Sequence, residues 1–293
     1  MVKLGRVLTA MVTPFDQNLQ VNYQAAQELA ARLIDSGSDG LVVAGTTGES
    51  PTLSKQEKLQ LFRAVVEVVG SKGTVIAGTG SYNTDESIEL TKEAEKTGVD
   101  GFLLVAPYYS KPPQEGLYRH FKAIAAATAL PVIVYNIPGR TGVNIAVDTM
   151  TRLAEVENIV GVKESAGSLA QASEIFEKTP DDFLLYSGDD ALTLPMLGVG
   201  GTGIISVAAH LVGRKIQSMV NAYLHGDITT AARINSELGP LNRALFINTN
   251  PIMVKAACNI LGFKVGGLRL PLVEADAKEL ETMRNVLIDL GLL

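Results

Sequence analysis

Residues 74–105 read TVIAGTGSYNTDESIELTKEAEKTGVDGFLLV: a short apolar run, a glycine-rich turn, a helical segment and a second apolar run. The two runs, residues 74–77 and 102–105, are apolar except for Thr74 and do not alternate with polar residues. Strands that are covered on both faces have this pattern, and such strands belong to parallel sheets. The stretch is therefore predicted to be a strand–helix–strand unit with parallel strands.

The same unit repeats along the chain. Further strands are predicted at residues 7–12, 41–44, 132–135, 159–163, 183–186 and 203–207. Apolar residues at helical spacing predict helices at residues 23–36, 54–69, 84–97, 114–127, 147–155, 168–178, 191–197 and 209–224. Ser54 and Glu57 have the spacing of a capping box, which favours a helix start at residue 54. Eight strands alternating with eight helices predict a (β/α)₈ TIM barrel over residues 1–224.

A doubly wound open sheet is the rival architecture. Such a sheet carries a glycine-rich phosphate-binding turn after its first strand, whereas residues 12–15 here read Val-Thr-Pro-Phe. Residues 225–293 contain helical patterns only, at 228–246, 251–261 and 276–290. We expect residues 225–293 to form a C-terminal helical extension packed beside the barrel, with a role in subunit contacts.

Composition argues against several classes of partner. The 293 residues include 25 Lys and Arg against 31 Asp and Glu, a net charge of -6, so no nucleic-acid partner is expected. No apolar run approaches the roughly 20 residues of a membrane helix, so no membrane association is expected. The chain has one cysteine, Cys258, and its start lacks the apolar stretch of a secretion signal. We expect a cytoplasmic protein with Cys258 in its core.

Lys163 is the sharpest candidate for chemistry, because functional residues of such barrels follow the C-terminal ends of the strands. It closes the apolar run 159–163 and shares a strand face with Gly161, opposite to Val160 and Val162. If that face looks into the barrel, the glycine leaves room for an amine in a partly dry interior. Such surroundings favour a neutral amine, which can attack a carbonyl. An ion pair with a carboxylate such as Glu164 explains a buried lysine equally well.

Other polar residues are expected at the same rim. The hydroxyl of Tyr135, at the end of the neighbouring strand, can relay protons at the Lys163 amine, although a core tyrosine bonded to backbone is commoner. Thr46 and Thr47 lie in a glycine-flanked turn that can bind a carboxylate, or they serve the turn alone. Arg140 can hold a carboxylate with two hydrogen bonds, or it is a solvated loop charge.

No pattern predicts a metal site or an organic cofactor. The three histidines lack the spacing of metal ligands and are expected at the surface or at helix ends: His120, His210 and His225. Asp189 and Asp190 precede a predicted helix, where acids favour the positive end of the helix dipole. Residues 198–203 match G-x-G-x-x-G, but they follow a helix and precede a strand, the reverse of the dinucleotide-binding context.

Seven short motifs occur together: GTTGE at 45–49, PYY at 107–109, QEGLY at 114–118, YNIPGRTG at 135–142, GVKE at 161–164, SGDD at 187–190 and NP at 250–251. In this combination the chain resembles, nearly end to end, the 4-hydroxy-tetrahydrodipicolinate synthase (dihydrodipicolinate synthase) family of the N-acetylneuraminate lyase superfamily. The resemblance implies a TIM-barrel lyase of the diaminopimelate route to lysine. It implies condensation of pyruvate with L-aspartate 4-semialdehyde through a Schiff base, with no cofactor.

The resemblance also implies roles for individual residues. Lys163 would form the Schiff base with pyruvate, and the proton relay would consist of Tyr135, Thr46 and Tyr109. Substrate-binding positions would be Thr47, Arg140, Gly188 and the backbone of Ile205. In this family the second tyrosine of the Tyr-Tyr pair enters the site from a neighbouring subunit. The resemblance therefore implies a homo-oligomer, a tetramer formed as a dimer of dimers.

Alternative functions remain open at this point. The nearest is a sister pyruvate-dependent aldolase that cleaves N-acetylneuraminate or a 2-keto-3-deoxy sugar acid with the same lysine, because fold and nucleophile do not fix the substrate. Arg140 and the doubled threonine favour the synthase. A more distant alternative is a non-catalytic barrel that binds a 2-oxo acid. Another is an aldolase that depends on a metal ion.

The sequence departs from the family at positions tied to regulation. Relatives that lysine inhibits carry histidines where this chain has Lys55 and Lys58. Because two added cations repel a cationic amino acid, we expect weak or absent inhibition by lysine. Pro51 and Tyr82 also differ from the residues usual in the family at this regulatory site. Glu86 and Tyr108 of the site are retained.

Overall fold

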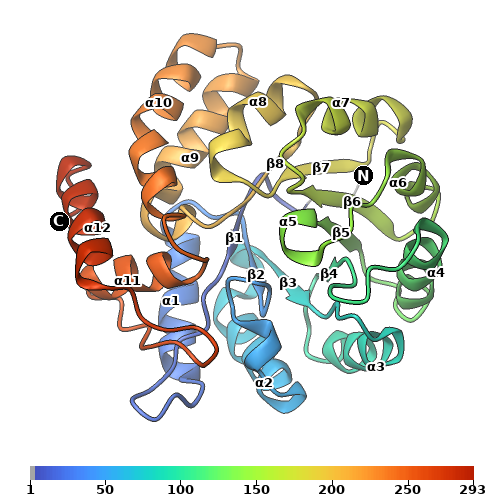
Figure 1. Ribbon diagram of the computed structural model, residues 1–293, viewed down its shortest axis with the longest axis horizontal. Coiled ribbons are helices and arrows are strands. Elements are labelled where there is room, and N and C mark those ends of the chain that lie inside the picture. The colour runs from blue at the N-terminus through green and yellow to red at the C-terminus, as the bar shows by residue number, and fades with distance from the viewer. Residues whose placement is uncertain (1–3) are drawn as a thin grey trace.

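The computed structural model describes residues 4–293; residues 1–3 of the segment predicted as the barrel lie outside the described residues. Eight strands form a closed barrel in which each strand pairs in parallel with the next and β8 pairs with β1 (Figure 1). The strands are β1 (Val7–Ala10), β2 (Gly40–Val43), β3 (Thr74–Gly78), β4 (Gly101–Val105), β5 (Val132–Asn136), β6 (Ile159–Glu164), β7 (Leu184–Ser187) and β8 (Gly203–Ser206). The predicted (β/α)₈ TIM barrel is confirmed.

A ring of helices surrounds the barrel (Figure 1). Its members are α1 (Tyr23–Asp35), α2 (Lys55–Val69), α3 (Thr84–Glu95), α4 (Gln114–Ala125), α6 (Val147–Ala154), α7 (Leu169–Lys178), α8 (Thr193–Gly198) and α9 (Ala209–Leu224). Short elements in the connections are η1 (Ser50–Thr52), η2 (Gly70–Lys72), α5 (Pro138–Thr141) and η3 (Asp190–Leu192). Helix α2 begins with the predicted capping box, because Ser54 and Glu57 each bond the backbone N–H of the other. The helix predicted at residues 191–197 begins instead as the 3₁₀ turn η3.

Two apolar layers explain why the strands are continuously apolar. One lies inside the barrel and includes Leu8, Ile76 and Tyr135, and the other lies between the strands and the helices. Alternate residues of each strand serve the two layers, as Tyr135 and Val134 do on β5. Both faces of the sheet are therefore covered by apolar side chains.

Strand β6 departs from simple alternation near its start. The pairing of β5 with β6 shifts register so that Val160 is skipped. Val160 packs against the inner layer, whereas Val162 belongs to the outer one, so the expectation that they share a face is wrong. A bulge adds one residue on one strand and re-aims the residues around it. Beyond the bulge, Lys163 lies on the inner side, beside Tyr135.

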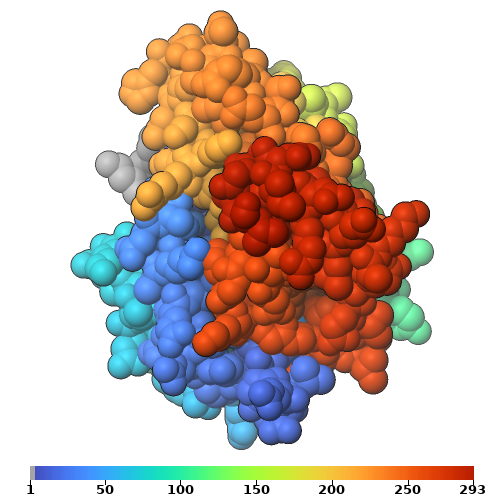
Figure 2. Space-filling model, turned by 90° about the vertical axis from the view of Figure 1, so that its left-hand side faces the viewer, coloured from blue at the N-terminus to red at the C-terminus, as the bar shows by residue number. Residues whose placement is uncertain are grey.

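The chain continues past α9 with α10 (Ile228–Ala244), α11 (Ile252–Ile260) and α12 (Ala277–Asp289), as a helical extension beside the barrel (Figure 1). Figure 2 shows the end of the chain covering one side of the molecule, next to the N-terminal segment. Contacts join the two parts there: Phe15 N–H donates to Val265 O, and the Arg32 guanidinium lies 3.5 Å from the centre of the Phe263 ring. The domain boundary at residue 225 stays a prediction. Within residues 4–293, no helix combines the length and hydrophobicity needed to cross a bilayer.

Candidate active site

The C-terminal ends of the strands surround a cavity of about 200 Å³. Its walls come mainly from the ends of β2, β3, β4 and β5 and from the turns that follow them. The residues that line it are Ala44, Gly45, Thr46, Ser50, Pro51, Gly78, Gly80, Leu103, Val105, Tyr108, Tyr135, Ile137, Arg140 and Thr141. Of the residues predicted for the site, Thr46, Tyr135 and Arg140 therefore share one cavity.

Lys163 does not itself line this cavity but lies against Tyr135, which does. Its side chain is buried, and its Nζ is 4.4 Å from the centre of the Tyr135 ring. Glu164 was the candidate ion-pair partner, but its carboxylate instead accepts hydrogen bonds from Asn136 Nδ2 and Gln171 Nε2. Burial raises the pKa of Glu164. The lysine is thus directed towards the tyrosine and away from its neighbouring acid.

Glycines let other groups come close to Lys163. A Cβ at Gly188 would lie 3.0 Å from Lys163 Cε, so a side chain there would displace the amine's stem. The space beside Gly161 was expected to accommodate the lysine, but it is taken by β7, because a Cβ there would lie 2.4 Å from Leu184 O. Ile205 of β8 is buried in the inner layer of the barrel.

The turn after β2 separates its two threonines. Thr46 lines the cavity, whereas Thr47 is buried and its Oγ1 accepts a hydrogen bond of 2.9 Å from Asn250 Nδ2. Arg140 Nη2 donates to the backbone oxygen of the same asparagine, at 3.1 Å. Asn250 of the C-terminal extension therefore connects two predicted substrate-binding residues. The sequence indicated Asn250 only as part of a family motif.

The two adjacent tyrosines lie in different environments. Tyr108 lines the cavity and meets Tyr82 edge-to-face, with ring centroids 5.1 Å apart, and burial raises the pKa of Tyr108. Tyr109 has left-handed backbone geometry (φ +68°), is 92% exposed and does not line the cavity. Within a single chain, Tyr109 is therefore not brought together with Lys163.

Of the residues tied to regulation, Pro51 and Tyr108 line the cavity, and the charges of the two lysines are partly compensated. Lys55 Nζ forms two ion pairs of 2.8 Å, with Glu89 and Glu93. Lys58 is half-buried; desolvation lowers its pKa, and the nearby charge of Glu86 acts in the opposite direction. The expected repulsion of a cationic ligand therefore rests mainly on Lys58.

The expectation for the histidines is wrong for His120, which lies in the middle of α4 and is buried. His210 is near the start of α9 but is also buried, whereas His225 is exposed at the end of that helix. Desolvation lowers the pKa of both buried histidines to about 4. Among residues 4–293, no three His, Cys, Asp or Glu side chains gather closely enough to hold a metal ion.

The acid pair after β7 divides its roles. Asp189 accepts a hydrogen bond from the Ala191 N–H at the start of η3, as expected of an acid at a helix start. Asp190 is instead buried and accepts hydrogen bonds from Ser206 Oγ and the Val207 N–H, and burial raises its pKa. It thereby holds the end of β8, the strand that carries Ile205.

The predicted core position of Cys258 is confirmed.

Sequence reasoning missed a buried ion pair next to the cavity. Lys255 Nζ of α11 lies 2.6 Å from Glu49 Oε1, and both side chains are almost completely buried. Glu49 belongs to the GTTGE motif, so the pair joins the extension to the turn that carries Thr46. No local signal along the sequence connects two residues so far apart.

The fold and this cluster define a (β/α)₈-barrel protein with a buried lysine at the rim where such barrels carry out chemistry. The sequence model of the Dihydrodipicolinate synthetase family matches residues 3–289, and the chain belongs to this family.

Individual relatives agree over the whole length. A 4-hydroxy-tetrahydrodipicolinate synthase of Desulforamulus reducens is 60% identical over 293 residues, covering 100% of this chain and 99% of the relative. A dihydrodipicolinate synthase of Cyanidioschyzon merolae, solved with lysine bound, is 49% identical with a TM-score of 0.98, covering 99% of each chain. A structure described as the first monomeric dihydrodipicolinate synthase variant is 42% identical with a TM-score of 0.96, covering 98% of this chain and 97% of that one.

Proposed function

We propose that this chain is a lyase that condenses pyruvate with L-aspartate 4-semialdehyde to give 4-hydroxy-tetrahydrodipicolinate, in the diaminopimelate route to lysine. The observation that carries the proposal is the buried Lys163 amine, directed at the Tyr135 ring beside a cavity that Thr46 and Arg140 line. Family membership and the named activity of a relative 60% identical over the full chain support it.

Lys163 begins the reaction. Its neutral amine attacks the ketone carbon of pyruvate, and loss of one water from the carbinolamine gives a Schiff base. The step needs a proton delivered to the departing oxygen and one removed from nitrogen. Tyr135, whose ring lies against the amine, carries a suitable hydroxyl, and Thr46 lines the same cavity as Tyr135.

The Schiff base then makes the methyl group of pyruvate reactive. Loss of a methyl proton gives an enamine, whose carbon attacks the aldehyde of the second substrate and forms the new C–C bond. The amino group of that substrate next attacks the Schiff-base carbon, closes the ring and releases Lys163 as the free amine. The lysine is thus regenerated, and no external electron acceptor is needed.

Two carboxylates have to be held during these steps. We assign the carboxylate of pyruvate to the turn of Thr47, together with Gly188 and the backbone of Ile205, because N–H groups of such turns bind anions. We assign the carboxylate of the semialdehyde to Arg140, which lines the cavity. The hydrogen bonds of Asn250 to Thr47 and Arg140 fix the spacing of the two subsites.

The enzyme is further proposed to work as a homo-oligomer, a tetramer built as a dimer of dimers, in the cytoplasm. Tyr109 supports this assembly, because a tyrosine that is 92% exposed in one chain is free to enter the site of a neighbour. Mixing subunits tests it: Lys163→Ala and Tyr109→Phe proteins, each poorly active alone, should regain activity when they exchange subunits. No recovery after exchange would place Tyr109 outside the relay.

Turnover assays test the reaction itself. Purified protein should consume pyruvate only when L-aspartate 4-semialdehyde is present, and Lys163→Ala should abolish this activity. The sister activity is tested beside it, as cleavage of N-acetylneuraminate or of a 2-keto-3-deoxy sugar acid under the same conditions. Faster cleavage of a sugar acid than condensation of the semialdehyde would overturn the proposal.

A further inference from the structure

The turn after β2 needs support from outside itself. Two of its residues that are not glycine, Ala44 and Glu49, have left-handed backbone geometry, with φ of +54° and +55°. Residues other than glycine adopt this geometry at a cost, and it persists where surrounding contacts hold it. Between them lie Thr46 and Thr47, the residues assigned to the relay and to pyruvate. What holds Glu49 therefore matters to both.

Both carboxylate oxygens of Glu49 are held by the C-terminal extension. Oε1 lies 2.6 Å from Lys255 Nζ, and Oε2 accepts a hydrogen bond of 3.0 Å from the Arg269 N–H. Lys255 Nζ also donates to Gly267 O at 2.7 Å and lies 4.0 Å from the centre of the Phe15 ring. The ammonium is thus fixed on several sides, and it in turn fixes the direction of the glutamate.

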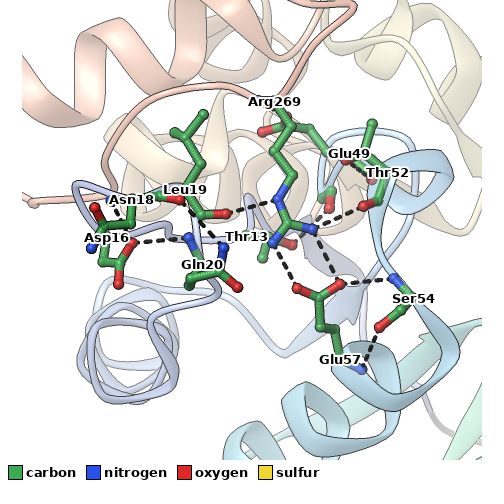
Figure 3. Close-up of polar contacts among 11 residues, drawn as sticks. Thr13, Asp16, Asn18, Leu19, Gln20, Glu49, Thr52, Ser54, Glu57 and Arg269 are labelled. Carbon is green, nitrogen blue, oxygen red and sulfur yellow. Dashed lines mark hydrogen bonds and ion pairs between the residues drawn. The ribbon is translucent and has the colours of Figure 1, made fainter.

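The side chain of Arg269 joins the extension to segments on either side of the turn (Figure 3). Its guanidinium donates to Leu19 O at 2.9 Å and to Thr52 O at 2.8 Å. It also forms a two-point ion pair with Glu57, with N–O distances of 2.6 and 3.1 Å. Bidentate pairs of this kind restrict orientation as well as distance. Arg269 therefore holds the loop after β1 and the start of α2 in one arrangement.

The turn is also held from the segment that follows β1. Thr13 Oγ1, which is buried, donates a hydrogen bond of 2.7 Å to Gly48 O. Three consecutive residues of the turn are thus each bonded to a different partner. Thr47 is bonded to Asn250, Gly48 to Thr13, and Glu49 to Lys255 and Arg269. A turn that only connected two elements at the surface would not need this many bonds to other segments.

We propose that Glu49 and Thr13 are positioning residues for the condensation, and that Lys255 and Arg269 of the extension act through Glu49 to keep Thr46 directed into the cavity. The inference rests on the proposed function. Its physical basis is that a misplacement of about 1 Å in a catalytic group can lower a rate about 100-fold. The extension of residues 225–293 thereby supports catalysis as well as packing against the barrel.

A double replacement tests the ion pair. Glu49→Met with Lys255→Met removes both charges and keeps their bulk, and apolar replacement of a whole buried pair usually leaves a protein folded. We expect kcat to fall about 10- to 100-fold and the KM for pyruvate to rise, while Lys163 is still trapped by borohydride with pyruvate. The matched control is Arg233→Gln with Glu237→Gln, an exposed pair on α10, which should keep both constants.

Thr13→Val provides a second, milder variant, because it removes one hydrogen bond from the same turn and keeps the shape of the side chain. We expect kcat to fall about 3- to 10-fold with the melting temperature within a few degrees of the parent. A twofold change or less in folded Thr13→Val, or in the folded double variant, overturns the inference. A parent protein that neither labels Lys163 nor turns over would instead refute the proposed function, so the two failures are distinct.

Discussion

Lowering the pH from about 7.5 to about 5 should destabilise the protein where β1 and β8 close the barrel, because His210 binds the segments that follow these two strands. The ring lies between the segments that follow β1 and β8: its Nε2 accepts a hydrogen bond of 3.1 Å from the Val12 N–H, and its Nδ1 donates to Val207 O at 2.8 Å. The bond from the Val12 N–H requires the neutral ring, because a protonated Nε2 cannot accept, whereas the bond from Nδ1 survives protonation. Burial accordingly lowers the pKa of His210 from 6.5 to about 4.

The sign and size of the effect follow from this difference in pKa. As the pH falls through 6.5, the unfolded chain binds a proton at His210 while the folded chain stays neutral until about pH 4. The contribution of His210 to the free energy of unfolding is therefore complete above pH 6.5 and is lost between pH 6.5 and pH 4. At pH 5 the loss is about 2 kcal/mol. His120, whose pKa burial also lowers to about 4, adds a similar amount, so the two together give about 4 kcal/mol.

Urea unfolding, followed by circular dichroism at fixed protein concentration, measures this loss at the two pH values. His210→Gln should be less stable at neutral pH, but it should lose about 2 kcal/mol less than the parent between the two conditions. His225→Gln is the matched control, because His225 is exposed, and its loss should equal that of the parent. A His210→Gln variant that loses as much as the parent would contradict the reasoning.

Other predictions concern the active site. Tyr135→Phe and Thr46→Val should each lower kcat by about 100-fold or more with little change in melting temperature, and rates near those of the parent would remove them from the relay. Arg140→Met should raise the KM for the semialdehyde about tenfold and leave that for pyruvate within about twofold, as initial rates with each substrate varied will show. L-Lysine at about 1 mM should leave turnover nearly unchanged because Lys58 repels it, and clear inhibition below that concentration would contradict the charge argument.

The barrel could be predicted from the sequence because its strands are buried on both faces and its helices on one. That difference produces continuous apolar runs at residues 74–77 and 102–105 and a helical pattern between them. The ends of elements were less accurate, as at η3, where Asp189 and Asp190 start a 3₁₀ turn before α8. The bulge at Val160 had no signal, since it is a matter of register between two strands.

The candidate site could be predicted only where residues follow strands directly. Tyr135 and Lys163 end adjacent strands, so parallel topology alone brings them together. The residues that hold the turn after β2 come from distant sequence: Asn250 and Lys255 contact this turn from the extension, and only the folded chain shows it. The buried position of His120 was missed for a related reason, because a lone histidine on a helix does not reveal which face it occupies.

Borohydride reduction in the presence of pyruvate, followed by peptide mass analysis, shows whether Lys163 forms a covalent bond to this substrate. We expect that one peptide, the one containing Lys163, gains the mass of one reduced pyruvate, and that Lys163→Ala gains none. A pyruvate adduct on a different lysine, or no adduct in a protein that still turns over, would contradict it.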